Sequence, residues 1–176
     1  MKNITIAIDG YSSTGKSTLA KQLAKHLGYV YVDTGAMYRA ITYFAMEQGY
    51  ISSEYFDKDT LIHSLSSIHL HFEFNAALGF AEMFLNNENV EKQIRTIEVS
   101  NFVSKVAEVS EVRAKLVEQQ QEMGKNKGIV MDGRDIGTTV FPNAELKIFV
   151  AADPAVRVER RFKELYAKNP YISIEE

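Results

Sequence analysis

A short stretch near the amino terminus constrains this chain more than any other part of it. Residues 4–8 form an apolar, mostly β-branched run that leads directly into Gly-x-x-x-x-Gly-Lys-Ser at positions 10–17. Apolar residues then recur at helical spacing up to Leu27. A glycine-rich loop between a strand and a helix is the P-loop, whose backbone N–H groups and helix dipole surround a phosphate. The sequence therefore predicts that the chain binds a nucleoside triphosphate.

The residues of this loop have separate roles. Gly10 and Gly15 permit backbone conformations that a side chain would obstruct. Lys16 supplies a mobile cation for the outer phosphates, and the Ser17 hydroxyl suits a Mg²⁺ ligand. The alternative interpretation is a plain turn rich in glycine and serine. We expect the triphosphate-binding set to be Gly10, Tyr11, Ser12, Ser13, Thr14, Gly15, Lys16, Ser17, Thr18 and Arg160.

Composition limits the class of protein. The 176 residues are 45% hydrophobic and 24% charged, which is ordinary for a soluble globular chain with one core and a small inserted subdomain. The absence of cysteine excludes disulfides, thiolate metal sites and cysteine nucleophiles. A net charge of −3 argues against non-specific nucleic-acid binding, and no stretch approaches the roughly 18 apolar residues of a membrane span. We expect a cytoplasmic monomer with no nucleic-acid or membrane partner.

Strand and helix patterns alternate along the chain, with one exception. Strands are predicted at 3–8, 29–32, 128–132 and 146–150. Helices are predicted at 16–27, at 36–48, at 97–123 with a restart capped by Ser110, and from Pro154 with Asp153 as its N-cap. Between them, residues 68–74 and 81–85 alternate as antiparallel strands do, with a turn at 86–90. We expect an α/β fold, a three-layer P-loop sandwich with a parallel central sheet and a small antiparallel insertion.

Polar clusters follow three of the predicted strands, at Asp9-Gly10, at 33–35 and at 132–135. Ligands of open parallel sheets lie beyond the carboxyl ends of the strands. The three clusters are therefore expected to converge on one cleft beside the P-loop. Asp132 suits a Walker-B-type acid or a ligand of a Mg²⁺-bound water, and its alternative role is to cap a turn.

Arginines add positive charge to the predicted cleft. Arg39 and Arg134 follow two of the clusters, and each guanidinium could hold a phosphate through two hydrogen bonds. The alternatives are that Arg39 is a solvated helix residue, and that the arginines at 157, 160 and 161 form an exposed basic face. A strongly cationic cleft suits phosphoryl transfer, because charge spreads over the transferring oxygens. The catalytic candidates are Lys16, Arg39, Asp132 and Arg134.

Four segments together resemble the bacterial cytidylate kinase family: residues 8–18, Asp33-Thr-Gly-Ala-Met-Tyr-Arg39, Gln93–Thr96 and Met131–Pro142. The resemblance covers essentially the whole chain, and the segments at 33–39 and 132–138 are far more specific than the P-loop. It implies ATP-dependent phosphorylation of CMP and dCMP to CDP and dCDP by direct transfer, with Mg²⁺. It also implies a core domain at 1–35 and 97–176 and a CMP-binding domain at 36–96.

The resemblance also implies an acceptor site when it is carried over position by position. Arg39 and Arg134 would contact the acceptor phosphate, whereas Asp135 would read the cytosine edge with a serine and an arginine. Cytosine offers an N4 donor to a carboxylate, and uracil presents an acceptor there instead. The full CMP-binding set is Thr34, Arg39, Ser104, Arg113, Arg134 and Asp135.

In that family the chain continues with an arginine-rich lid, a fifth sheet strand and a terminal helix, which this sequence does not include. Residues 157–176 are expected to lead into the lid, with a loop or a helix start from Asn169 onward. We expect a longer parent chain, because a sheet without that strand would expose apolar surface. Two rival functions are a small P-loop kinase with another acceptor and a module that holds ATP without transferring its phosphate. The second rival does not need acceptor-side residues.

Overall fold

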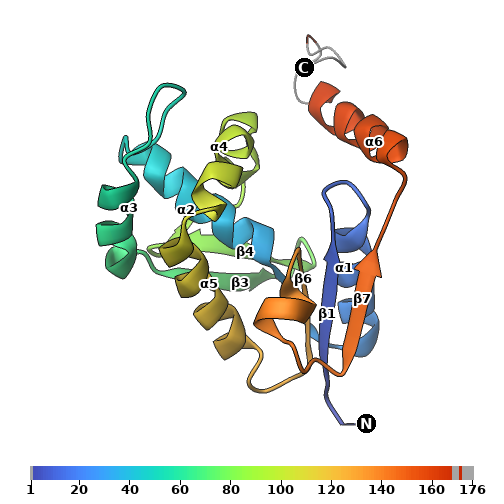
Figure 1. The fold of residues 1–176 in the computed structure, drawn as a ribbon. Coiled ribbons are helices and arrows are strands. Elements are labelled where there is room, and N and C mark those ends of the chain that lie inside the picture. The colour runs from blue at the N-terminus through green and yellow to red at the C-terminus, as the bar shows by residue number, and fades with distance from the viewer. Residues whose placement is uncertain (1, 168–170, 172–176) are drawn as a thin grey trace.

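The computed structural model describes residues 2–167 and 171, and it contains two separate sheets (Figure 1). The four-stranded sheet has the order β2-β6-β1-β7 with all pairs parallel, and the three-stranded sheet β3-β4-β5 is antiparallel. The strands are β1 (Thr5–Gly10), β2 (Val30–Asp33), β3 (Leu70–Asn75), β4 (Phe80–Leu85), β5 (Glu88–Asn89), β6 (Ile129–Gly133) and β7 (Leu146–Val150). The predicted α/β fold with an antiparallel insertion is confirmed.

The helices follow the predicted pattern with two differences. They are α1 (Lys16–Leu27), α2 (Thr34–Glu47), α3 (Lys58–Ser64), α4 (Ile97–Ala107), α5 (Ser110–Met123) and α6 (Pro154–Tyr166), with short 3₁₀ turns η1 (Leu65–Ser67) and η2 (Gln93–Arg95) and a π turn η3 (Ile136–Val140). Helix α3 was not predicted, because seven residues are too few for a clear 3.6-residue period. The restart at 110 is confirmed, but Ser110 does not cap it: the N-cap is Val109, and the Ser110 hydroxyl donates to Glu111. Asp153 caps α6 as predicted, since its carboxylate accepts from the Ala155 N–H.

The parallel sheet is packed on both faces. Successive residues of β1 point to opposite sides, as in any strand. Ile6 and Ile8 are fully buried and pack with Ala20 and Ala24 of α1. Ala7 faces the other side, in a cluster that also holds strand residues of β2 and β6 and residues of η3 and α5. This packing forms the predicted three-layer arrangement.

A larger hydrophobic cluster joins the antiparallel sheet to the helices around it. Met37 and Ile41 of α2 pack with Met83 of β4, and Leu116 of α5 belongs to the same cluster. Burying side chains of this size stabilises each by roughly 1.5–3 kcal/mol relative to exposure. The cluster thus extends past residue 96 into α4 and α5. The boundary between a CMP-binding domain and a core domain at residue 96 stays a prediction.

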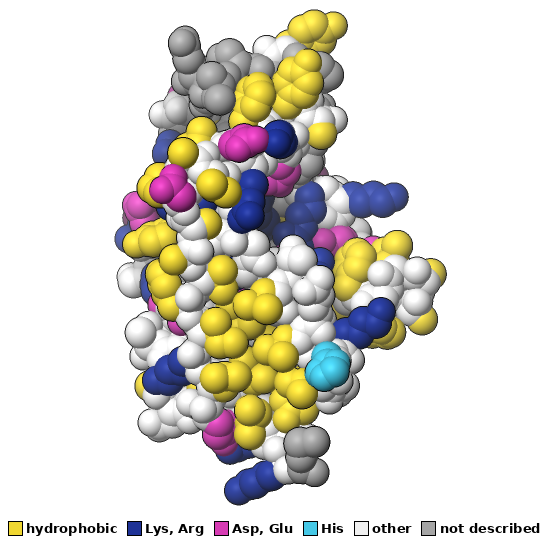
Figure 2. Space-filling model, turned by 90° about the vertical axis from the view of Figure 1, so that its right-hand side faces the viewer, with side chains coloured by type: hydrophobic (Ala, Val, Ile, Leu, Met, Phe, Trp, Pro, Cys, Tyr) yellow, Lys and Arg dark blue, Asp and Glu magenta, His cyan; other side chains and the backbone are white. Residues whose placement is uncertain are grey.

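The β7 side of the molecule exposes apolar surface. Strand β7 lies at the edge of the parallel sheet, and α6 leaves from its carboxyl end (Figure 1). Phe149 of β7 is 63% exposed and meets Tyr11 edge to face, with ring centroids 6.1 Å apart. Figure 2 shows hydrophobic side chains gathered on this face. Exposed apolar surface at this edge was expected. The predicted loop or helix start at residues 169–176 lies outside the described residues apart from Tyr171. None of the helices within the described ranges is long and apolar enough to cross a membrane.

Candidate active site

The P-loop glycines are required for two different reasons. Gly10 is the register partner of Val150, and a Cβ on Gly10 would lie 2.5 Å from the Val150 carbonyl oxygen. Real Cβ atoms do not come so close, so the loop leaves β1 only because this position has no side chain. Gly15 has φ of 93°, in the left-handed region that glycine adopts without strain. It is the N-cap of α1, where the loop becomes the helix.

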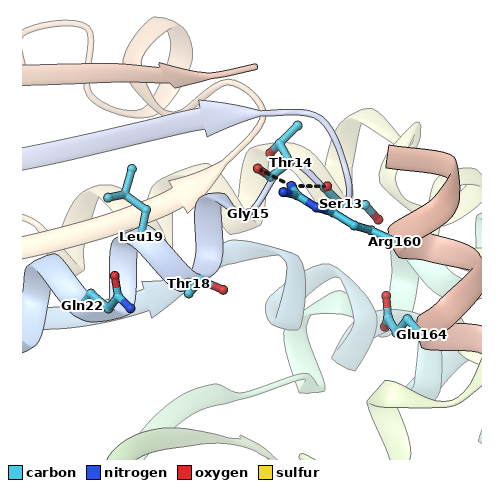
Figure 3. A pocket seen from close by; sticks show the side chains of 8 residues that line it. All are labelled: Ser13, Thr14, Gly15, Thr18, Leu19, Gln22, Arg160 and Glu164. Carbon is cyan, nitrogen blue, oxygen red and sulfur yellow. Dashed lines mark hydrogen bonds between the residues drawn. The ribbon is translucent and has the colours of Figure 1, made fainter. Parts of the chain in front are cut away.

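Arginines of α6 hold the outer side of the P-loop. Arg157 Nε donates to the Ser12 carbonyl oxygen at 3.0 Å, and Arg160 Nη1 donates to the carbonyl oxygens of Ser13 at 3.4 Å and Thr14 at 3.2 Å. Figure 3 shows Arg160 reaching from α6 to the loop. A hollow of about 530 Å³ lies beside this contact. Arg157 and Arg160 are therefore not simply a solvated basic face. The hollow is lined by Ser13, Thr14, Gly15, Thr18, Leu19, Gln22, Arg160 and Glu164.

The Ser17 hydroxyl is fixed by the end of β6. Ser17 Oγ donates to Asp132 Oδ2 at 2.7 Å, and Tyr31 OH donates to Asp132 Oδ1 at 2.9 Å. Asp132 is only 2% exposed. Burial, and next the charge of Asp33, raise the pKa of the Asp132 carboxyl to about 6. This buried carboxylate therefore binds a proton more readily than an exposed aspartate does.

Asp33 lies beside Asp132 and has a different set of partners. Its Oδ1 accepts from the Ala36 N–H and so caps α2, and its Oδ2 pairs with Arg95 Nη2 at 3.0 Å. Arg95 also pairs with Glu91 at 2.8 Å. Burial lowers the pKa of Arg95, but the two carboxylates more than offset it and the net pKa is raised. The Asp33 charge is thus held by a helix N-terminus and a permanent cation.

One cleft of about 530 Å³ brings most of the predicted site residues together. Those that line it are Ser12, Ser13, Lys16, Ser17, Thr34, Arg39, Ser104, Arg113, Asp132, Arg134 and Asp135. Thr14, Gly15, Thr18 and Arg160 line the neighbouring hollow instead, and Gly10 and Tyr11 line neither. The cleft therefore joins the triphosphate loop to the residues that the resemblance assigns to the acceptor.

The acceptor half of the cleft is built from α2, α4, α5 and the end of β6. Arg39 Nη1 donates to Ser100 Oγ at 2.8 Å and to the Ile94 carbonyl oxygen at 3.4 Å. Burial, and next the charge of Arg95, lower the pKa of Arg39. Across the cleft Arg113 Nη2 pairs with Asp135 Oδ2 at 2.5 Å. The cleft wall therefore carries a carboxylate whose orientation is fixed by a guanidinium.

Two predicted residues have structural partners of their own. Asp9 was expected in the cleft, and this was wrong: its carboxylate accepts from the N–H groups of Ile136 at 2.7 Å and Gly137 at 2.8 Å. Asp9 therefore anchors the start of η3 behind the cleft. Thr34 does line the cleft, but it is 3% exposed and its hydroxyl donates to the Asp132 carbonyl oxygen at 2.8 Å.

The cleft also contains residues that the site prediction did not include. Tyr38 and Arg95 lie within segments already singled out, so the signal was present in the sequence. Arg161 is one of the three arginines for which the alternative was an exposed basic face, and it pairs with Glu164 at 3.0 Å. Glu108 and Glu164 line the cleft without any motif to indicate them. The additional lining residues are Asp33, Gly35, Tyr38, Arg95, Val103, Ala107, Glu108, Gly133, Arg161 and Glu164.

Comparison with known proteins identifies the family. The sequence model of the family described as cytidylate kinase matches residues 6–176. A cytidylate kinase of Flavobacterium johnsoniae is 72% identical over all of this chain, which spans 76% of that protein. Cytidylate kinases of Flavobacterium psychrophilum and Bacteroides fragilis are 66% and 54% identical over all of this chain, which spans 78% and 77% of them. The chain therefore belongs to the cytidylate kinase family.

Proposed function

We propose that this protein transfers the γ-phosphoryl group of ATP directly to CMP and dCMP, which gives CDP and dCDP. Membership of the cytidylate kinase family supports the reaction. The structural observation that carries it is that one cleft joins the P-loop residues Lys16 and Ser17 to the Arg113–Asp135 pair. A module that only holds ATP would not need the second half of this cleft.

Arg39 and Arg134 suit the acceptor phosphate. Arg39 is half-buried, and within the described part of the chain its hydrogen-bond acceptors are a hydroxyl and a carbonyl, with no carboxylate at ion-pair distance. A guanidinium whose pKa is lowered by burial and by a neighbouring arginine is stabilised when an anion binds beside it. Arg134 is exposed in the same cleft and adds a second guanidinium. A phosphate monoester is the anion that matches this pair in charge and geometry.

The Arg113–Asp135 pair, with Ser104, suits the cytosine ring. The carboxylate accepts from the N4 amine, while the guanidinium and the hydroxyl donate to N3 and O2. The ion pair orients both groups before the base arrives, which reduces the cost of ordering them. Uracil would place its O4 acceptor against the Asp135 carboxylate, so two acceptors would face each other with no proton between them.

Lys16, with Arg39 and Arg134, would neutralise charge on the phosphoryl group during direct, in-line transfer. The catalytic contribution of these groups is position and charge, since phosphoryl transfer demands little covalent chemistry from a protein. No covalent intermediate with the protein is part of this proposal. Asp132 would act by holding the Ser17 hydroxyl in place.

The residues at the P-loop fit a Mg²⁺–ATP complex. Ser17 and Asp132 offer oxygen donors, which Mg²⁺ prefers. The described residues contain no group of three or more His, Cys, Asp or Glu side chains placed for a metal ion. Mg²⁺ that binds with a nucleotide is usually held by one or two protein groups together with substrate phosphates and water. When bound, Mg²⁺ would neutralise phosphate charge while Ser17 and Asp132 hold it in place.

The proposed division into domains comes from the family resemblance. Residues 36–96 would serve as the CMP-binding domain, and residues 1–35 and 97–176 as the P-loop core domain, which also supplies the base-reading residues of α4, α5 and the end of β6. Helix α6 would begin a lid that excludes water. The cysteine-free composition fits a reducing cytoplasm, and we propose a monomer there without nucleic-acid or membrane partners.

The deciding experiment is a coupled ADP-release assay with ATP and Mg²⁺. CMP, dCMP, UMP, AMP and GMP are offered in turn. The proposal predicts that ADP release depends on the acceptor and is fastest with CMP and dCMP. Equal turnover with AMP or GMP would reject the cytosine assignment, and ADP release without acceptor dependence would favour the ATP-holding module.

A further inference from the structure

Tyr31 reaches the phosphate end of the cleft from behind and does not line it. It is the register partner of Val130 on β6, so its side chain shares a sheet face with Asp132, two residues further along. Helix α1 packs on that same face and supplies Ser17. Two hydroxyls therefore meet one carboxylate, with Tyr31 on Oδ1 at 2.9 Å and Ser17 on Oδ2 at 2.7 Å.

Asp132 depends on these hydroxyls for its orientation. In the described part of the chain its side chain has no ion pair, although the charge of Lys16 acts on it from further away, and Arg95 pairs with Asp33 and Glu91 instead. Both oxygens of the carboxylate are occupied, one by each hydroxyl. Without the Tyr31 hydroxyl the carboxylate could turn about its last torsion, which is a broad and weakly restrained rotation. Ser17 would then lose its fixed acceptor.

Tyr31 is itself held in place by neighbouring elements. It packs against the buried cluster between the sheet and α1. The Lys21 ammonium lies 5.6 Å from the centre of its ring and 4.8 Å from the centre of the Phe80 ring on β4. Its position is therefore fixed on two sides, as a group that orients another group must be.

We propose that Tyr31 is a positioning residue for the Mg²⁺–nucleotide site, acting through Asp132 on the Ser17 hydroxyl. A hydroxyl that donates its proton to Asp132 keeps its lone pairs directed elsewhere, which suits a metal ligand. The inference rests on the proposed metal role of Ser17 and Asp132. No chemical step is assigned to Tyr31.

The test measures binding rather than turnover alone. Affinity for a non-hydrolysable ATP analogue is measured by calorimetry, once with excess Mg²⁺ and once in EDTA, for the unaltered protein and for Tyr31→Phe. Loss of a group that orients a metal ligand weakens metal binding by about tenfold or more. The affinity with Mg²⁺ should fall by about this factor, and the affinity in EDTA should stay the same. The Mg²⁺ concentration for half-maximal activity should rise while the KM for CMP does not change.

Two control variants separate the possible failures. Tyr29→Phe removes a neighbouring tyrosine hydroxyl that accepts from the Ile4 N–H, far from Asp132, and should leave both affinities unchanged. Asp132→Asn tests the metal assignment itself. An unchanged Mg²⁺ effect in Tyr31→Phe beside a clear loss in Asp132→Asn would overturn the role of Tyr31 alone. If Mg²⁺ has the same effect on affinity in Tyr31→Phe and Asp132→Asn as in the unaltered protein, the metal assignment is overturned, and this inference with it. Equal losses with and without Mg²⁺ in Tyr31→Phe would indicate general loosening and would also overturn it.

Discussion

Asp33 and Asp132 are register partners on β2 and β6, so two carboxylates stand side by side at the carboxyl end of the parallel sheet. Like charges at such positions repel each other and destabilise a sheet. Asp33 is compensated by Arg95, whereas Asp132 has two neutral hydroxyl donors. Burial and the Asp33 charge accordingly raise the pKa of Asp132 to about 6. The site therefore holds a carboxylate whose ionised form costs stability.

The first prediction concerns the pH dependence of stability in Asp132→Asn. The native pKa of about 6 lies above the ordinary value of 3.8. The contribution of this carboxyl to the free energy of unfolding is therefore fully present below pH 3.8 and is lost as the pH rises through 6. At pH 8 the ionised group costs about 3 kcal/mol, at about 1.4 kcal/mol for each pKa unit. The neutral, isosteric asparagine should therefore raise the free energy of unfolding by about 1–3 kcal/mol at pH 8 and not at pH 4.

Urea unfolding without metal or nucleotide, at both pH values, measures this difference. The matched control is Asp59→Asn, which changes an exposed carboxyl in the first turn of α3. A gain of the same size at pH 4 and pH 8 would contradict the prediction.

The second prediction concerns the close approach at Gly10. Alanine there would meet the Val150 carbonyl oxygen, which belongs to backbone and cannot turn away. Gly10→Ala should destabilise the protein by about 1–3 kcal/mol, as overpacking does, and weaken nucleotide binding. Gly28→Ala is the control, since Gly28 has φ of 68° but nothing within 4 Å of an added Cβ. Thermal unfolding with and without ATP compares the two, and equal ATP affinities would show that the approach at Gly10 does not shape the loop.

The third prediction concerns Asp9 as the anchor of η3. Its two oxygens accept from the N–H groups of Ile136 and Gly137, so an asparagine would turn its amide N–H₂ toward a backbone donor. Asp9→Asn should cost about 2–4 kcal/mol of stability, since bonds to charged acceptors contribute about 1.5–3 kcal/mol each. Because η3 follows Asp135 directly, the KM for CMP should rise more than the KM for ATP. Chemical denaturation and initial rates test the two parts, and a rise confined to the KM for ATP would contradict the assigned position.

The fourth prediction concerns Lys16. Its ammonium lies 3.3 Å from the Tyr11 carbonyl oxygen and makes little contribution to packing, so Lys16→Met should keep the fold. The rate of phosphoryl transfer should fall by about 100-fold or more, because a cation aimed at developing charge is removed. CMP affinity should be unchanged. Lys25→Met, in the last turn of the same helix, is the control. Normal turnover in Lys16→Met would overturn the site assignment.

The strands and the P-loop could be predicted because their signals are local. Residues 4–18 contain the apolar run, the glycine spacing and the helical period in one continuous stretch. The convergence of the strand ends followed from a general rule of parallel sheets. Helix α3 carries too short a pattern to detect, and the turn η3 depends on the Asp9 carboxylate, 127 residues away from its partner Ile136.

The hydrogen bonds that orient the site carboxylates could not be predicted, because they join residues far apart in the sequence. Tyr31 and Asp132 are 101 residues apart, and only the register of β2 against β6 brings them together. Asp9 and Asp132 both end a buried strand, yet one binds backbone N–H groups and the other a serine and a tyrosine. Sequence identifies such carboxylates as candidates, and the packing around them decides which one faces the ligand.

The CMP-to-UMP selectivity of the unaltered protein and of Asp135→Asn tests the central claim most directly. The ratio of the two kcat/KM values is measured for both proteins, with Asp59→Asn on the exposed surface of α3 as the control. We predict that CMP is strongly preferred, and that Asp135→Asn reduces the preference by about 10- to 100-fold, since a charge-assisted hydrogen bond contributes about 1.5–3 kcal/mol. A ratio that is the same in both proteins would contradict the assignment of Asp135 as the group that reads cytosine.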